Sequence, residues 1–173
     1  MTTPQRMPAW LALGGVAMCG LGACKREGDG HLGNCADPIL LDGTPTRGTQ
    51  STAGTQQALS AADPTCLGAA TLGPERVYQV ALSGSEKTHL RVTVTPAETP
   101  GPAAFDPVVY LMRDCVAAPA CVAAEDRRGG GSLELLEHTN TTGLTESLFL
   151  VVDGYDFQPQ GGAYHLALEL LPP

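Results

Sequence analysis

The strongest constraint on the fold is the alternation of apolar and polar side chains along residues 88–95, THLRVTVT. In an extended chain Leu90, Val92 and Val94 point to one side, and the residues between them point to the other. This period of two predicts a strand with one buried face and one solvent-exposed face. Long stretches with the helical period of about 3.6 residues are missing from the rest of the chain.

Other short apolar runs are separated by residues that favour turns, among them 21 glycines and 14 prolines. Their β-branched and aromatic side chains predict strands, although SLELLEH also fits a helical turn. Together with residues 88–95 they predict eight or nine strands and an all-β fold, an antiparallel β-sandwich. These further strands are expected at 38–41, 76–83, 106–115, 121–126, 132–138, 147–154 and 163–171.

Two of these strands have different burial patterns. Residues 108–112 form a continuous apolar run, which suits a strand that is buried on both faces. The last strand alternates instead, and its core-facing residues are expected to be Tyr164, Leu166, Leu168 and Leu170. We therefore expect one strand with two buried faces and one strand with a single buried face.

The first 23 residues have the pattern of a secretory leader. A polar start that contains Arg6 precedes an apolar segment at 10–23, and the charged stretch KREGDG follows at once. The apolar segment is 14 residues long, whereas a transmembrane helix needs about 20 residues. The sequence LGAC at 21–24 closes this segment and resembles the lipobox of bacterial lipoproteins.

The lipobox resemblance implies that Cys24 becomes the first residue of the mature chain and carries a thioether-linked diacylglycerol and an N-acyl chain such as palmitate. More than one acyl chain makes such an anchor effectively permanent. The expected parts are a signal peptide at 1–23, a lipidated N-terminus with a flexible tether at 24–34, and a β-sandwich domain at 35–173. Lys25 after the cysteine implies the outer membrane of a bacterial cell envelope. The alternative is an ordinary leader followed by a coincidental cysteine.

The charge of the mature chain limits its partners. The full sequence has a formal charge of −8, and the leader removes one basic residue and no acid, which leaves −9. An acidic chain disfavours nucleic acid, because phosphate binding needs clustered lysine and arginine. It equally disfavours electrostatic attachment to anionic lipid. Membrane attachment is therefore expected through the lipid on Cys24, and the domain is expected to have an envelope protein or a polysaccharide as its partner.

Four cysteines follow Cys24, an even number that predicts two disulfides in an exported chain. Cys115 and Cys121 flank VAAPA, whose proline can turn the chain back. This favours a disulfide between Cys115 and Cys121, and therefore a second one between Cys35 and Cys66. A four-cysteine zinc site is disfavoured, since such sites use two close pairs and this chain has one.

Three short features resemble a known bacterial domain. They are Asp106 before a tyrosine-containing run, DG at 153–154 after a valine-rich strand, and GAY at 162–164 in the last strand. With the strand pattern of residues 66–171 they resemble the pre-peptidase C-terminal (PPC) domain. The resemblance implies a jelly roll with an accessory role, and some members of that family bind calcium at loop acids. Such domains usually accompany a catalytic domain, and none is recognisable in this sequence.

Common catalytic motifs are absent from the sequence. It has no G-x-S-x-G, no H-E-x-x-H and no phosphate-binding loop, which favours a non-catalytic binding or structural role over a hydrolase of unidentified type. The four histidines, His31, His89, His138 and His165, are scattered and are expected on the solvated surface. Residues 140–142, NTT, match a glycosylation sequon and are interpreted as a polar loop.

Two weaker hypotheses concern the loops. Asp106, Asp153 and Asp156 are candidate calcium ligands, since calcium takes several oxygen ligands from neighbouring loops. The simpler interpretation is that these carboxylates accept hydrogen bonds from nearby backbone amides and cap turns. Tyr155 and Phe157 are candidates for stacking on a carbohydrate ring, and the alternative is that they pack over one end of the sandwich. The sequence indicates no other cofactor.

Overall fold

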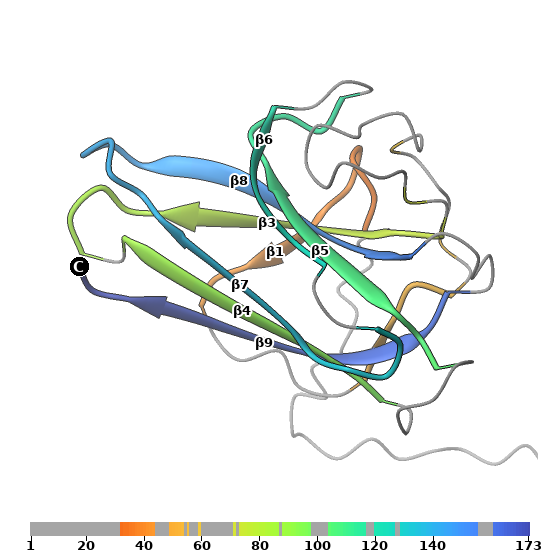
Figure 1. Ribbon diagram of the computed structural model, residues 1–173. Helices are drawn as coiled ribbons and strands as arrows, with labels where there is room; N and C mark the ends of the chain where they lie inside the picture. The colour runs from red at the N-terminus through yellow and green to blue at the C-terminus, as the bar shows by residue number, and fades with distance from the viewer. Residues whose placement is uncertain are drawn as a thin grey trace, which may run out of the picture.

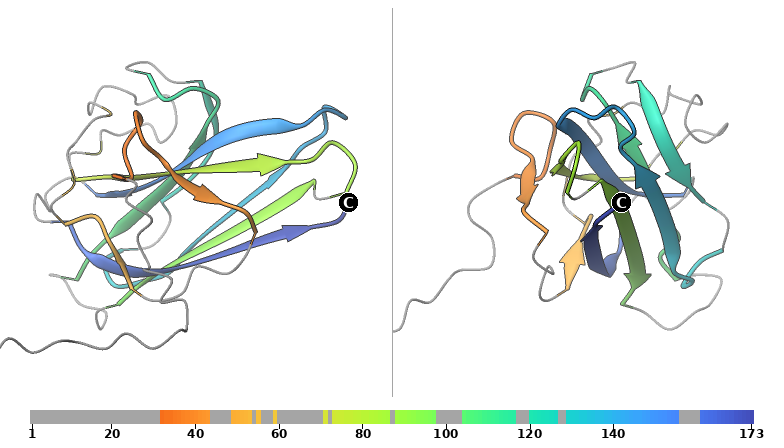
Figure 2. Two further views of the ribbon diagram at one scale, coloured as in Figure 1. Left: turned by 180° about the vertical axis from the view of Figure 1, so that it is seen from behind. Right: turned by 90° about the vertical axis from the view of Figure 1, so that its left-hand side faces the viewer.

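The computed structural model describes residues 32–43, 49–53, 55, 59, 71, 73–86, 88–97, 104–116, 120–126, 129–155 and 161–173. Cys24 and the predicted leader lie outside these residues, as do Cys66, Asp156 and Phe157. The described residues form two facing β-sheets, which confirms the predicted all-β sandwich (Figure 1, Figure 2). This part of the chain contains no helix with the length and apolar character of a membrane span.

The described residues include nine strands in two sheets. The strands are β1 Ile39–Leu41, β2 Gln50–Ser51, β3 Arg76–Leu82, β4 His89–Pro96, β5 Pro107–Met112, β6 Cys121–Glu125, β7 Glu134–Thr139, β8 Glu146–Gly154 and β9 Ala163–Leu171. The five-stranded sheet has the order β1-β3-β8-β5-β6, and the four-stranded sheet has the order β2-β9-β4-β7. SLELLEH thus contributes a strand, β7, rather than a helical turn.

The order of β2 to β9 is that of a jelly roll. When β2 is counted as the first strand, one sheet holds the first, eighth, third and sixth strands. The other sheet holds the second, seventh, fourth and fifth strands. Every neighbouring pair among these eight strands is antiparallel. The predicted jelly-roll architecture is therefore confirmed.

Two short strands differ from the sequence prediction. β1 pairs with β3 in parallel, so residues 32–43, which we call the N-terminal arm, add one parallel edge strand to the sheet. A parallel neighbour is reached through a crossover and not through a hairpin, so local sequence does not reveal it. β2 has two residues and pairs with Ala163 and Tyr164 of β9. A strand this short is too brief to leave a periodic signal.

The core lies between the two sheets and follows the predicted alternation. Leu90, Val92 and Val94 of β4 are fully buried, whereas Arg91 between them is exposed. Removing one such side chain from water stabilises a fold by about 1.5–3 kcal/mol. The facing strands contribute further buried residues to the same cluster, among them Tyr78, Val80, Leu82, Leu148, Leu150, Tyr164, Leu166 and Leu168. Leu170 packs against the cluster but is only partly buried.

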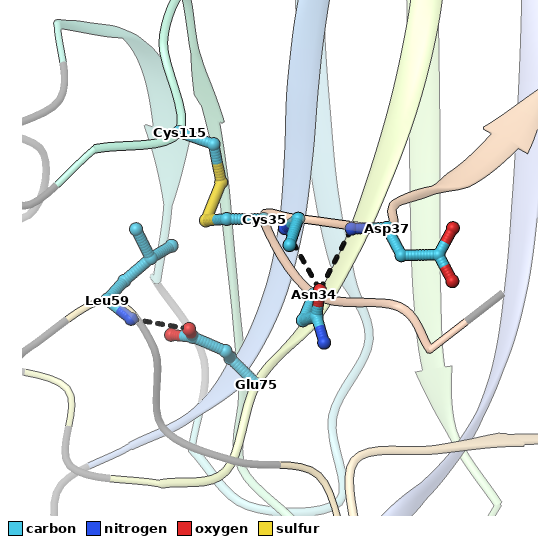
Figure 3. Close-up of a disulfide and its surroundings, with 7 residues drawn as sticks. Asn34, Cys35, Asp37, Leu59, Glu75 and Cys115 are labelled. Atoms are coloured by element: carbon cyan, nitrogen blue, oxygen red, sulfur yellow. Dashed lines mark hydrogen bonds between the residues drawn. A yellow bond between two sulfur atoms is a disulfide. The ribbon is translucent and has the colours of Figure 1, made fainter.

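A second apolar cluster covers the outer face of the five-stranded sheet. Alternate residues of β5 point to this side, while the residues between them face the core. The backbone amide of Leu59 donates to Oε1 of the buried Glu75 at 2.6 Å and so holds Leu59 over the sheet (Figure 3). This second layer explains why the run 108–112 is buried on both faces, as predicted. The cluster contains Leu59, Val77, Val108, Tyr110, Met112 and Val151.

A disulfide joins Cys35 to Cys115 and fastens the N-terminal arm beside this second cluster (Figure 3). The predicted disulfides between Cys115 and Cys121 and between Cys35 and Cys66 are therefore wrong. The Cα atoms of Cys35 and Cys115 lie 5.4 Å apart, although 80 residues separate them in the sequence. The pairing of β1 with β3 brings the arm across the sheet, a contact that a local argument about VAAPA misses. Cys121 is also disulfide-bonded.

Hydrogen bonding of the domain starts within the segment that the sequence assigns to the tether. The amide of Val77 donates to the carbonyl of Gly33 at 2.8 Å, which joins this segment to the edge of β3. The side chain of Asn34 accepts hydrogen bonds from the amides of Ala36 and Asp37 (Figure 3). These bonds hold the turn that presents Cys35 to its partner.

Asn140 holds two loops together at the end of the sandwich where the C-terminus lies (Figure 1). Its side-chain amide donates to the backbone carbonyls of Leu82, Ser83 and Leu144. Its Oδ1 accepts from the amide of Thr142 at 2.9 Å. Asn140 is only 4% exposed. The asparagine of the sequon is therefore a buried structural residue, and the predicted polar loop is organised around it.

Non-reducing peptide mapping tests the disulfides. We expect one peptide pair that joins Cys35 to Cys115, and a second peptide pair that contains Cys121. Cys35→Ser is expected to lower the free energy of unfolding by about 4 kcal/mol, because the lost disulfide closes a large loop. Urea denaturation measures this loss. A peptide that joins Cys115 to Cys121 would contradict the structure.

Asn140→Ala removes the donors to three backbone carbonyls at the C-terminal end of the sandwich. The expected loss is about 2–3 kcal/mol of unfolding free energy, since buried carbonyl groups lose their hydrogen bonds. Thr141→Ala is the matched control, because Thr141 is exposed in the same loop and should cost less than about 0.5 kcal/mol. Equal urea midpoints for the two variants would refute the structural role of Asn140.

Candidate functional site

The described candidate residues gather at one end of the sandwich, where β3 and β5 begin and β8 ends. We call this the loop end. The register places Arg76 opposite Val152 and Pro107 opposite Gly154. The amide of Tyr155 donates to the carbonyl of Asp106 at 2.9 Å. The fold therefore brings Asp106, Asp153 and Tyr155 to the same end, as expected from their positions at strand ends.

Asp153 is fully buried on the outer side of β8. Its Oδ1 accepts from the amide of Gly154 at 2.6 Å, and its Oδ2 lies 3.4 Å from the hydroxyl of Tyr110. Burial raises the pKa of Asp153 to about 6, although hydrogen bonds from Thr71, Gly154 and Tyr110 partly oppose the rise. Asp153 thus accepts a hydrogen bond from a nearby backbone amide, as in the simpler of the two interpretations, but it does so within β8 and not in a turn.

Asp106 faces another acidic side chain. Burial raises its pKa, and the charge of Asp126 adds to the rise. The pKa of Asp126 is raised in turn by burial and by the charge of Glu125. Among the residues that the structure describes, no group of three or more histidine, cysteine, aspartate or glutamate side chains is arranged to hold a metal ion. Asp156, the third candidate calcium ligand, lies outside the described residues.

Tyr155 follows β8 and is 38% exposed. An isolated bridge pairs it with Thr71. Phe157, its expected partner in sugar stacking or in packing, lies outside the described residues. The structure thus places one ring of the candidate aromatic pair at the surface of the loop end.

A group of hydrogen-bond donors on the inner side of the loop end was missed by the sequence analysis. Arg76 opens β3, and its buried Nε has no hydrogen-bond partner in the described part of the chain. The hydroxyls of Tyr78 and Tyr164 lie 2.7 Å apart, and both rings are fully buried. Burial raises the pKa of both hydroxyls, that of Tyr78 to about 12, and the charge of Arg76 partly opposes the rise. The sequence did contain one signal for this group of donors, because Arg76 is a basic residue at a core-facing position of a strand.

Glu146 forms an ion-pair cluster along the side of the sandwich. Its carboxylate lies 2.6 Å from Nη1 of Arg113 and 3.0 Å from Nε2 of His138, which belongs to the other sheet. Burial alone would raise the pKa of Glu146, but its hydrogen bond with His138 and the charges of His138 and Arg113 hold that pKa below its usual value. The expectation of a solvated His138 is wrong, because this pairing leaves its side chain only 16% exposed. The cluster ties β7 to β8.

The outer face of the four-stranded sheet is open to solvent, and its charged groups pair with one another. Arg91 on β4 donates from Nε to Glu137 of β7 at 2.8 Å, and its Nη1 lies 3.6 Å from Glu169 of β9. His89 lies on the same face, with Nδ1 at 2.9 Å from the hydroxyl of Thr139. The position of His89 agrees with the expected surface location.

Comparison of the chain with protein-family models, curated proteins and solved structures finds no match. The functional assignment therefore depends on the sequence features and on the geometry of the loop end. The strongest structural features there are the buried Asp153 and the donors around Arg76.

The buried Asp153 predicts a specific dependence of stability on pH. Because its pKa is about 6 in the folded state and 3.8 in its ordinary state, the folded protein holds this proton more tightly than the unfolded protein. The stabilisation is complete below about pH 4 and is lost as pH rises through about 6. Relative to Asp153→Asn, the wild type should lose about 2 kcal/mol of unfolding free energy between about pH 4 and about pH 7.

Urea denaturation of both proteins at each pH measures this difference. Asparagine keeps an oxygen for the amide of Gly154 but does not titrate. A difference between the two proteins that stays constant across the range would show that Asp153 titrates normally.

Proposed function

We propose that this chain is a lipid-anchored protein of the bacterial cell envelope whose jelly-roll domain has a non-catalytic binding role. The observation that carries the proposal is the disulfide between Cys35 and Cys115, in a domain that follows the lipobox-like LGAC by eleven residues. Disulfides persist in oxidising compartments and are rare in the cytosol. The disulfide and the leader independently support export.

The way in which the charged groups are used supports a binding role over hydrolysis. Glu146 and Glu137 are ion-paired, and the buried Asp153 accepts a hydrogen bond from the backbone amide of Gly154. Each of these carboxylates therefore has a role in holding the fold. A general acid or base would need a carboxyl group directed at a bound substrate.

The relation to PPC domains is part of the proposal. It is supported by the jelly-roll strand order and by a physical reason for the GAY motif. A Cβ on Gly162 would clash with the ring of Phe105, so this position requires glycine. Phe105 stacks on Tyr164 with ring centroids 6.1 Å apart. The motif thus closes the core at the loop end.

Membrane fractionation tests the anchor. Cys24→Ala is expected to move the protein from the membrane fraction to the soluble fraction, because the covalent lipid holds it there. Mass spectrometry of the wild-type N-terminal peptide should show the added diacylglycerol and acyl chain. Cys19→Ala, a change within the leader, is the matched control and should leave the protein in the membrane fraction. Membrane retention of Cys24→Ala would refute the lipid anchor.

A further inference from the structure

We propose that Arg76 and the Tyr78–Tyr164 hydroxyl pair bind a carboxylate group at the loop end. This inference deepens and rests on the binding role proposed above, and it names the chemical class of the ligand. It does not depend on the lipid on Cys24. Three observations carry it. Among the described residues Arg76 has no ion pair, and one hydroxyl proton of the tyrosine pair has no acceptor. Arg76 and Tyr78 lie two residues apart on the inner face of β3.

Arg76 differs from the other arginines that the structure describes. Arg91 pairs with Glu137, and Arg113 pairs with Glu146. Arg76 has no ion pair among the described residues, and its buried Nε has no hydrogen-bond partner there. A buried N–H without an acceptor is costly, since its lost hydration is not replaced. An acceptor supplied by a ligand would remove this cost.

The turn of the N-terminal arm lies over this arginine. A Cβ built on Gly33 would meet Cγ of Arg76 at 3.2 Å and Nε at 3.5 Å. Gly33 has a φ of +66°, in the left-handed region that favours glycine. Glycine therefore lets the turn approach the arginine closely. Arg76 as a whole residue is half-buried, and its Nε is the buried part.

The tyrosine pair supplies a further donor. Each hydroxyl carries one proton, and a single hydrogen bond of 2.7 Å joins the two oxygens. The hydroxyl that accepts in this bond still has its own proton to donate. Arg76 and Tyr78 occupy core-facing positions two residues apart on β3. The free proton and the guanidinium therefore lie at the same end of the core.

A carboxylate matches this set of donors. Its two oxygens can accept from Nε and one Nη of the planar guanidinium in a bidentate pair. One of the oxygens has a further lone pair for the tyrosine proton. The chain as a whole is acidic, with a formal charge of −8, so the anion is held by these local donors and not by long-range attraction.

Thermal unfolding of the purified protein in sodium acetate tests the proposal, with sodium chloride and acetamide as matched solutes. A ligand that binds the folded state raises the melting temperature by mass action. We expect a saturable rise in acetate alone, and at least a tenfold weaker response in Arg76→Gln. Arg76→Lys should respond weakly, since lysine has no bidentate fork. Arg91→Gln, at an ion pair on the other sheet, should respond like the wild type.

A second readout is spectroscopic, and its first part uses the wild type alone. Acetate binding should change the near-ultraviolet tyrosine absorption of the wild type, and Tyr78→Phe should weaken binding by about fivefold, as expected for one lost hydrogen bond. Equal melting temperatures in acetate and chloride, with no absorption change, would show that water alone fills the site. A full acetate response in Arg76→Gln would place the carboxylate elsewhere. Either result would overturn this inference and leave the fractionation test of the anchor unaffected.

Discussion

The structure depends on burial of both faces of the five-stranded sheet. A jelly-roll sheet with one wet face needs no cover, but β5 is apolar on both sides and must be covered on both. The N-terminal arm supplies part of that cover, and the Cys35–Cys115 disulfide keeps it in place. The same cover buries the carboxylates of Glu75 and Asp153. Burial in this layer raises the pKa of Asp153, so the contribution of Asp153 to stability falls from acidic to neutral pH.

The two ends of the sandwich use their polar groups differently. At the C-terminal end, Asn140 uses both its amide donors and its oxygen to join loops, which is typical of a rigid structural site. At the loop end, Arg76 and one tyrosine hydroxyl retain donors without acceptors in the part of the chain that the structure describes. A natural sequence satisfies its buried polar groups almost everywhere, and exceptions tend to occur at functional sites. The buried hydroxyl oxygen of Thr88, beside Asn140, also has no partner among the described residues. The loop end is still the better place to look for a ligand, because its exception, Arg76, is charged.

The proposed anchor limits how far the loop end can lie from the membrane. Eight residues separate Cys24 from Gly33, which lies against Arg76. Even fully extended, such a segment spans about 30 Å. With Cys24 in the bilayer, as proposed, the loop end stays near the membrane surface. The ligand of Arg76 is then expected in the membrane-proximal space, and the outer face of the four-stranded sheet is free to face other envelope components.

Local sequence determined the strands, because the spacing of apolar side chains along a strand reflects which of its faces are buried. The alternation of Leu90, Val92 and Val94 and the apolar run 108–112 each predicted the burial found. The jelly-roll class followed from the number of strands and from the PPC resemblance. Local sequence also indicates the leader and Cys24, since an export signal is read as a linear motif.

Only the tertiary structure decided which distant residues meet. Cys35 reaches Cys115 across 80 residues, His138 reaches Glu146 from the other sheet, and Arg76 comes to lie beside the Tyr78–Tyr164 pair. A single sequence carries no periodic signal for contacts between sheets, because strand order and the path of the crossovers set them. The candidate site around Arg76 was likewise decided by the tertiary structure, since each of its donors lies on a strand that was predicted for packing alone.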